Sequence, residues 1–405
     1  MKIMLQFELK KIFHKQVNKI VLFILAAVVL AGSCLAIRDV WYYREDGSKI
    51  SGLSAARQLK KEQNKWKGYI TEDVLRRVVE EEKAARVSSA GDEVLFKIQG
   101  YDDIRDMINI GFSEVGDYDY YMCGNISPDE AAGLYDRRML RIKEEIKASE
   151  EKAGTALSEK EREYLLNQYE SLKTPLYYEY AEGWKALMDS QYLSTLMTIT
   201  IVIIGFLVSG IFSDEFRFKA DSIFFSAKLG RNKAIGAKIK AGLVAITVVY
   251  WSAMLLFSAI ILLALGFGGA GRMIQTGRNF SSIYNITYFQ FWLFTLLGGY
   301  IGTLFILMLA MFVSVKSRSA VVAITIPFAL SCAPMFLGRI PAMTYIMNLF
   351  PDMLLRINWY VEEYLIYEIG GKVFRGYSVL IPIYLVLFLG MVPVLYYGYK
   401  RVEVK

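Results

Sequence analysis

Long apolar runs divide the sequence. Nearly charge-free runs occupy 20–37, 191–212, 241–266, 291–315, 319–338 and 377–399. Each run is about 18 to 26 residues long, a length that suits a membrane span. A helix of about 20 residues crosses a hydrocarbon core about 30 Å thick. Only helices and closed barrels satisfy every backbone group in lipid, and these runs lack the alternation of barrel strands. The pattern therefore predicts an all-α integral membrane protein with six transmembrane helices.

The polar segment 38–190 separates the first two runs and predicts a large, mostly helical, water-exposed domain. Residues 127–130 and 158–161 are capping boxes, and the helices that they open are predicted to end near residues 151 and 172. Another helix is predicted over 53–86, with an interruption near Gly68. Thr174-Pro175 is predicted to open a helix that continues directly into the second span.

Two shorter segments complete the layout. Residues 1–16 place Leu5, Leu9 and Ile12 on one helical face, which predicts an N-terminal interfacial elbow helix. Residues 339–376, between the fifth and sixth spans, are predicted to form two short outer helices. The expected divisions are 1–37 (elbow helix and first span), 38–190 (water-exposed domain) and 191–405 (five spans and the loop 213–240).

The distribution of lysine and arginine predicts the orientation. Segments 2–19, 213–240, 316–318 and 400–405 are basic, and all four fall on one side if the spans alternate. The positive-inside rule makes that side cytoplasmic, so both termini are expected inside the plasma membrane and 38–190 outside. Residues 38–190 contain 24 basic and 31 acidic residues, so the net charge of +7 conceals an acidic domain in a basic chain. A basic face beside anionic lipid explains the high pI, and we expect no nucleic-acid partner.

The sequence offers no catalytic constellation. The one histidine, His14, lies in a basic segment, which excludes His-dependent triads and His metal clusters. No G-x-x-x-x-G-K-[ST] loop occurs, so ATP hydrolysis is expected on a separate subunit. No span carries a charge away from its ends, which argues against a proton- or sodium-driven carrier. We expect no enzymatic activity, no cofactor and no metal.

The loop after the second span carries a recognisable pattern. An acidic residue, Glu215, ends the span, a short apolar segment leads to Ser226, and Arg231 and Lys238 precede the next span. This loop resembles the first cytoplasmic loop of type-2 ABC transporter permeases, although 228–230 replace the proline commonly found there. The elbow helix, six spans and outer helices fit the same family over residues 1–37 and 191–405. The insertion at 38–190 resembles those of bacterial permeases for peptide-antibiotic export and resistance.

The resemblance implies two sets of functional residues. A coupling helix over 216–225 would sit in a groove of the ATPase subunit, anchored by its aromatics and aligned by its charges. The implied ATPase-coupling residues are Glu215, Phe216, Arg217, Phe218, Asp221, Phe224, Phe225, Arg231 and Lys238. The second and fifth spans line the substrate path in the family, which here gives Ser194, Met197, Thr198, Ile201, Thr325 and Phe328. A basic, aromatic loop also suits the inner membrane surface, which is the alternative for this segment.

The expected function is the permease subunit of an ATP-driven ABC transporter, paired with ABC ATPase subunits and a second permease, identical or different. It would export or extract an amphipathic or hydrophobic peptide, lipid or drug, because the implied path is apolar with a few hydroxyls. The alternative is a mechanotransmitter, in which the ATPase cycle moves the extracellular domain to control a cell-envelope enzyme or sensor and nothing crosses. Six spans favour transport, and a membrane enzyme ranks third.

Overall fold

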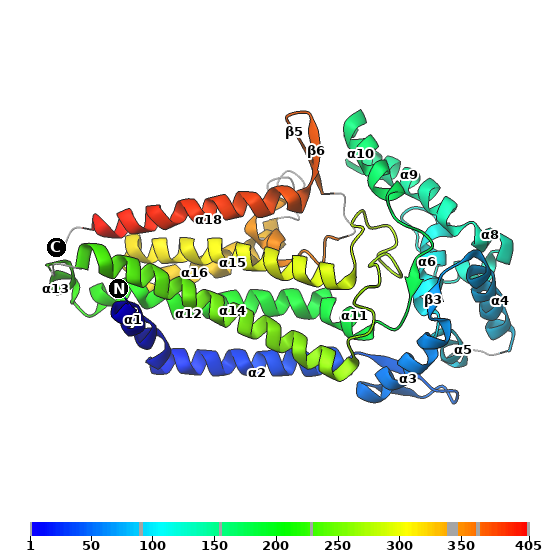
Figure 1. Ribbon diagram of the computed structural model, residues 1–405, viewed down its shortest axis with the longest axis horizontal. Coiled ribbons are helices and arrows are strands. Elements are labelled where there is room, and N and C mark those ends of the chain that lie inside the picture. Colours follow the sequence, from blue (N-terminus) through cyan, green and yellow to red (C-terminus); the bar gives the residue numbers. More distant parts are fainter. Residues whose placement is uncertain are drawn as a thin grey trace.

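The structure is a computed structural model of the chain and describes residues 2–88, 92–153, 156–226, 230–337, 347–361 and 365–402. It is mostly helical and elongated, with a bundle of long helices on one side and residues 38–190, hereafter the insert, on the other (Figure 1). Both termini lie at the end of the bundle that is remote from the insert, hereafter the terminal end (Figure 1).

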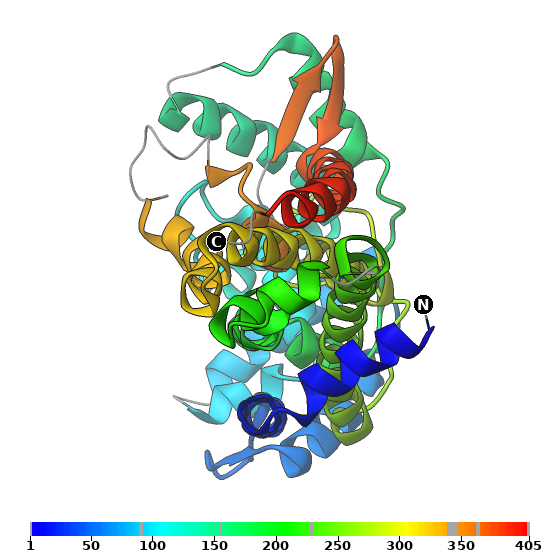
Figure 2. The same cartoon turned by 90° about the vertical axis from the view of Figure 1, so that its left-hand side faces the viewer.

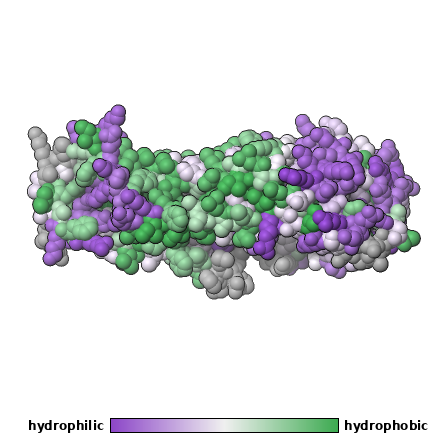
Figure 3. All heavy atoms as spheres, turned by 90° about the horizontal axis from the view of Figure 1, so that it is seen from below, coloured by the Kyte–Doolittle hydropathy of each residue, from purple (hydrophilic) through white to green (hydrophobic). Residues whose placement is uncertain are grey.

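Within the described residues, five helices are long and apolar enough to cross a membrane: α2 (Gln16–Arg38), α12 (Ser190–Arg217), α14 (Ile235–Leu265), α15 (Tyr288–Ser317) and α18 (Gly376–Lys400). The remaining predicted span corresponds to α16 (Ala320–Leu337), a shorter apolar helix with two internal prolines. Hydrophobic surface forms a band over the middle of the molecule, and hydrophilic surface covers both ends (Figure 3). These features are consistent with a helical membrane protein.

α15 lies at the centre of the bundle, in contact with α12, α16 and α18. Its glycines Gly298 and Gly302 face residues 351–357 of the same chain, where the 3-10 helix η4 (Pro351–Leu355) lies against α15. A Cβ at Gly302 would come within 3.1 Å of Leu354 Cβ. The G-x-x-x-G spacing therefore serves a close contact within the chain.

Of the two outer helices predicted within 339–376, most of the first, expected over 343–350, lies outside the described residues, because 338–346 and 362–364 are not described. The second, expected over 352–369, is wrong. Besides η4, the segment forms an antiparallel hairpin of β5 (Ile366–Ile369) and β6 (Lys372–Arg375). Gly370 and Gly371 make its turn with φ of +59° and +76°. A two-residue turn with both φ positive matches the twist of paired strands, so the turn decides the structure here rather than helical periodicity.

The insert consists mainly of short helices and has its own apolar core, which includes Leu75, Ile104, Met107 and Ile108. β1 pairs with β2, and β3 pairs with β4. In chain order its elements are β1 (Trp41–Tyr43), β2 (Lys49–Ser51), α3 (Leu53–Gln63), η1 (Asn64–Trp66), β3 (Gly68–Tyr69), α4 (Glu72–Ser88), α5 (Asp92–Ile98), α6 (Asp102–Phe112), α7 (Met122–Asn125), α8 (Pro128–Ala132), α9 (Leu134–Ala153), α10 (Glu159–Glu170), β4 (Tyr177–Tyr178) and α11 (Glu182–Met188).

Local sequence signals predicted several of these helices well. The capping boxes at Ser127 and Ser158 are confirmed. Each serine side chain accepts from the backbone N–H three residues on, and its own backbone N–H donates to the side chain of the glutamate at that position. The interruption near Gly68 is also confirmed, at the start of β3. Gly133 divides the helix predicted to reach residue 151 into α8 and α9.

The continuous helix predicted from Thr174-Pro175 into the second span is wrong. β4 follows instead and pairs with β3, and the fully buried Tyr178 hydroxyl donates to Gly100 O at 3.0 Å. α11 comes next, and a break at Asp189 separates it from α12. Asp189 caps α12 by accepting from the Gln191 N–H. Packing of Tyr178 against distant residues outweighs the local helix signal.

Candidate functional site

α1 (Lys2–His14) is the predicted elbow helix, and it lies across the terminal end of the bundle. Figure 2 shows α1 side-on where α2 is seen end-on. Leu5, Leu9 and Ile12 pack against the core, as their shared face predicted. Ile3 and Phe7 point away and are 81% and 66% exposed. α1 therefore has one face on the bundle and a second apolar surface outside it.

The single coupling helix predicted over 216–225 is two elements. α12 ends at Arg217, Lys219 turns the chain with a left-handed φ of +54°, and α13 (Asp221–Ser226) follows. The π-helical turn η2 (Gly230–Ala234) then leads into α14. Asp221 opens α13, where a carboxylate suits the positive end of a helix. The side chain of Arg231 lies outside the described residues.

The aromatic residues of this loop are of two kinds. Phe216, Phe224 and Phe225 gather around the buried Tyr399 ring of α18, with centroid separations of 6.2, 5.9 and 5.1 Å. Phe218, by contrast, is 65% exposed. Ile223 on α13, which the sequence analysis did not select, is 74% exposed. The first three aromatics hold the loop to the bundle, and the apolar groups free to meet a partner are Phe218 and Ile223.

Lys238 is fully buried near the start of α14 and joins three helices. Its Nζ lies 2.7 Å from Glu215 Oε1 on α12 and 3.3 Å from Glu8 Oε2 on α1, and it donates to Ile211 O at 2.7 Å. Lys11 of α1 reaches the same Glu215 oxygen at 2.8 Å. The structure thus brings the predicted Glu215 and Lys238 together and adds two residues of α1. The sequence signal that could have indicated this ion-pair cluster is Glu8, an acidic residue among the N-terminal lysines.

The six residues implied for the substrate path do not share one surface. Ser194, Met197 and Ile201 are buried in the bundle, and Thr198 is half-buried. Thr325 and Phe328 on α16 are exposed. α12 and α16 pack where Gly205 meets Pro327, and a Cβ at that glycine would approach the proline ring to 2.7 Å. The outward face of α12 beside this contact instead carries Thr195, Val202 and Phe206.

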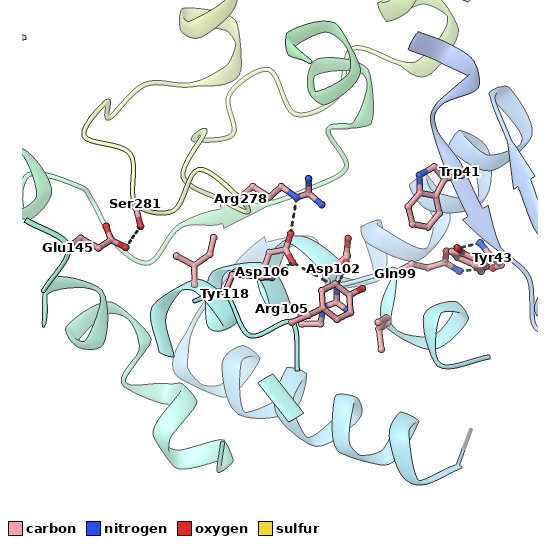
Figure 4. Close-up of a pocket in the computed structure, with 13 residues that line it drawn as sticks. Trp41, Tyr43, Gln99, Asp102, Arg105, Asp106, Tyr118, Glu145, Arg278 and Ser281 are labelled. Atoms are coloured by element: carbon pink, nitrogen blue, oxygen red, sulfur yellow. Dashed lines mark hydrogen bonds and ion pairs between the residues drawn. The ribbon is translucent and has the colours of Figure 1, made fainter. Parts of the chain in front are cut away.

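A cleft separates the insert from the neighbouring ends of α2, α12 and α15. It consists of two adjoining cavities of about 650 and 470 Å³, which share Trp41, Gln99, Asp102, Asp106 and Arg278. Figure 4 shows Asp102, Asp106 and Arg278 converging on its centre, with Trp41 and Tyr43 along one side. The sequence analysis did not identify this site, because its walls come from segments far apart in the chain.

Asp103 anchors the floor of the cleft. Its Oδ2 lies 2.7 Å from Nη2 of the fully buried Arg272, in the segment between α14 and α15, and its Oδ1 lies 2.9 Å from Lys185 Nζ on α11. Burial opposes ionisation, but Arg272 and Lys185 hold the pKa of Asp103 well below its usual range. Gly277 approaches so closely, with φ of +119°, that a Cβ there would lie 3.0 Å from Asp103 Oδ1. This carboxylate is a structural link between the insert and the bundle.

Asp102 and Asp106 face the open part of the cleft. Arg105 Nη2 lies 2.6 Å from Asp102 Oδ1, and its guanidinium stacks 4.4 Å from the centre of the Tyr120 ring. Desolvation, together with the neighbouring carboxylates, raises the pKa of Asp102 to about 6, and burial raises the pKa of Asp106 as well. Arg278 reaches Asp106 Oδ2 at 3.6 Å with a side chain that is 89% exposed. The arrangement can hold a positively charged group.

Comparisons with known proteins add no assignment: no family model, no curated protein and no solved structure matches the chain. Among the described residues, no group of three or more histidine, cysteine, aspartate or glutamate side chains is placed to hold a metal ion. The features of the molecule that bear on function are the terminal end, the exposed surface of α12 and α16, and the cleft.

Proposed function

We propose that the chain is the permease subunit of an ATP-driven type-2 ABC transporter in the plasma membrane. It would work with separate ABC ATPase subunits and a second permease, and export or extract an amphipathic or hydrophobic peptide, lipid or drug. Six spans are part of this proposal. The 18 residues of α16 extend about 27 Å at 1.5 Å per residue, close to the thickness of a hydrocarbon core.

The observation that carries the proposal is the construction of the terminal end. A transverse helix α1, the short helix α13 and both chain termini lie there, while the insert occupies the opposite end (Figure 1). The basic segments of the sequence fall at this end too, which supports a cytoplasmic location. α13 presents Ile223 and the preceding turn presents Phe218, and exposed apolar side chains in a polar rim suit a protein partner.

The outward face of α12 and α16 supports a path shared with the second permease. On α16, Thr325 and Phe328 from the implied path are exposed, and on the neighbouring α12, Thr195 and Phe206 are exposed while Thr198 and Val202 are half-buried. This face is apolar with hydroxyls, a surface that suits an amphipathic molecule better than a bare ion, which would lose hydration without replacement.

The test is isolation of the tagged chain in mild detergent with its native partners. A co-purified protein with a phosphate-binding loop should appear, and its ATP hydrolysis should depend on the loop. Phe218→Ala, Ile223→Ala and Asp221→Lys should each release the ATPase or uncouple its stimulation. Phe7→Ala on α1 is the matched control, because it removes an exposed phenylalanine at the same end. Full stimulation in all three loop variants would reject docking through this loop.

A mechanotransmitter is the second candidate, and one set of contacts favours it. The insert is hydrogen-bonded to the segment between α14 and α15. Arg138 Nε donates to Phe280 O at 2.9 Å, and the Tyr169 hydroxyl donates to Ser281 O at 2.9 Å. Asp103 holds Arg272 in the same segment. A displacement of α14 or α15 would thus move the insert. Transport of no substrate by a fully coupled complex, with ATP-dependent motion of the insert, would favour this candidate.

A further inference from the structure

We propose that the cleft between the insert and the bundle binds the ammonium or guanidinium group of a cationic amphiphile, and that Arg278 occupies the site when the ligand is absent. The proposal is independent of any ATPase, because binding is a property of this chain alone. It assigns a ligand to a site at the opposite end of the bundle from the loop 213–240.

The size and walls of the cleft suit an organic ligand. The cavities of about 650 and 470 Å³ are connected through the residues that they share, and sites for small molecules typically span about 300–1,000 Å³. Apolar and aromatic side chains form much of the wall, among them Trp41, Tyr43, Ile98 and Ile110. The second cavity extends to Tyr192 and Phe291, near the ends of two long apolar helices. An apolar body can therefore lie along the wall while a polar head enters the centre.

The charge of the lining selects a cation. Seven carboxylates face the two cavities but only three cationic side chains do, and the cations are Arg105, Lys185 and Arg278. Arg105 is committed to Asp102 and stacked on Tyr120, and Lys185 is committed to Asp103 and Glu182. The carboxylates are Asp39, Asp102, Asp103, Asp106, Glu145, Glu182 and Asp189. Arg272 and Arg141 lie outside the lining but pair with Asp103 and Glu145, so the seven carboxylates face five cations in all. The remaining excess of carboxylates, partly removed from water, is stabilised by a further positive charge.

Arg278 has the properties of a displaceable counter-ion. Its partner, the Asp106 side chain, is 8% exposed, whereas the Arg278 side chain is 89% exposed and their closest atoms are 3.6 Å apart. Arg272, six residues earlier, shows the contrast: it is fully buried and lies 2.7 Å from Asp103. An exposed pair of this geometry holds little free energy, so an incoming cation can take the place of Arg278 beside Asp106.

Two sources could supply the same chemistry: a soluble cationic amphiphile such as a lysine-rich peptide, and a membrane lipid with an ammonium headgroup. Both place a positive charge next to an apolar body, and the cleft lies beside the ends of the long apolar helices. The experiment below separates them by changing the peptide and the lipid independently.

The test uses the full chain in nanodiscs of phosphatidylcholine and phosphatidylglycerol. The probe is a fluorescent amphipathic peptide of leucine and lysine, compared by anisotropy with a twin in which glutamine replaces every lysine, and with empty nanodiscs. The lysine peptide should bind at least about tenfold more tightly than its twin after the empty-disc signal is subtracted, because its charge is held by partly desolvated carboxylates. Equal binding of the two peptides would overturn the proposal.

Two variants separate ligand binding from damage to the fold. Asp102→Asn with Asp106→Asn should weaken binding of the lysine peptide about tenfold. Arg278→Ala should tighten it about threefold, because the resident cation no longer competes. A merely structural arginine would not give a tighter complex when removed. Arg57→Ala on α3, an exposed arginine outside the cleft, is the matched control and should change nothing. Unchanged or weaker binding by the Arg278→Ala chain would reject the counter-ion role.

Acidity supplies an independent readout. Since the pKa of Asp102 is raised to about 6, binding of the lysine peptide should weaken between pH 7.5 and pH 5 as this carboxylate is protonated. The other charged or titratable groups facing it are Asp103, Arg105, Asp106, Tyr118, Glu145, Glu182, Lys185 and Arg278. Binding that stays constant over this range would contradict the placement of the cation beside Asp102.

The lipid arm replaces phosphatidylcholine, whose quaternary ammonium has no N–H to donate, by phosphatidylethanolamine, whose primary ammonium can donate hydrogen bonds to the carboxylates. A lipid occupant predicts that this exchange weakens peptide binding to the unaltered chain but not to the doubly substituted Asp102→Asn, Asp106→Asn chain. A soluble occupant predicts no effect of the exchange on either chain. Both results keep the cation site and identify its source. An equal loss in both chains would mean that the lipid acts away from the cleft, and the lipid source would be rejected.

Discussion

The buried cation at the terminal end gives the most direct test of how the elbow helix is held. Lys238→Met keeps the length of the side chain but removes its charge from between Glu215 and Glu8. Lys238 is fully buried and the two glutamates are 7% and 8% exposed. Removing one partner from a buried ion pair typically costs about 3–5 kcal/mol when the remaining charge stays buried without compensation. Lys11 still pairs with Glu215 at 2.8 Å, so Glu8 is the carboxylate that loses its partner, which places the loss at the lower end of this range. We expect a loss of free energy of unfolding in this range.

The assay is equilibrium unfolding of the full chain by SDS in mixed micelles, with hydrogen exchange of α1 as a local readout. Lys240→Met, an exposed lysine on the same helix, is the matched control and should change the free energy of unfolding by about 0.5 kcal/mol or less. In the Lys238→Met chain the amides of α1 should exchange faster than those of α15. Adding Glu8→Gln should recover part of the loss, since it removes the carboxylate that Lys238 no longer compensates.

The result that would refute this reasoning is equally specific. If Lys238→Met costs no more than Lys240→Met, the cluster does not hold α1. If, in addition, the Lys238→Met chain binds the ATPase normally but fails to stimulate it, Lys238 acts in coupling alone, as the sequence resemblance implied.

The remaining predictions concern topology, the insert and energy. Single cysteines at the exposed Ser149 and Ser226 should label from opposite sides of intact cells, and labelling from one side would refute the orientation. Asp103→Asn leaves Arg272 without its carboxylate and should destabilise the chain by about 3 kcal/mol, measured as a lower unfolding temperature, with the exposed Asp46→Asn as control. The pKa of Asp103 is depressed, so this difference should persist from pH 8 to pH 5 and shrink only below about pH 4. Transport should survive collapse of the proton gradient while ATP is maintained, and abolition by that collapse alone would reopen a secondary-carrier mechanism.

The sequence predicted those parts of the fold that depend on local composition. Apolar runs fix the long helices because a helix in lipid must be apolar over its whole length, and a capping box such as that at Ser127 acts within four residues. The predictions failed where distant contacts decide. The burial of Tyr178 places a strand where Thr174-Pro175 suggested a helix, and the paired turn glycines at 370–371 make a hairpin in place of an outer helix.

The candidate sites were harder to predict because burial, not residue type, separates structural groups from free ones. Phe216 and Phe218 look equivalent in the sequence, yet one packs near Tyr399 and the other is exposed. The acidic residues of 102–106 were visible, but nothing in the sequence shows that they meet Arg278 and Trp41 across a cleft. Two consecutive aspartates at the start of a helix are ordinary, since carboxylates suit that position.

Two buried cations show how the ends of the molecule are connected. Lys238 lies near the start of α14 and Arg272 lies just beyond its end, and each pairs with a carboxylate more than 160 positions away in the sequence, Glu8 and Asp103 respectively. α14 is thus joined by ion pairs to the elbow helix at the terminal end and to α6 of the insert at the other. Because packed helices move as rigid units, a displacement of α14 at the terminal end is carried to the floor of the cleft. Such a connection would let an ATPase cycle alter the cleft in a transporter or in a mechanotransmitter. The identity of the ligand that binds the cleft therefore distinguishes these two functions more directly than the number of spans does.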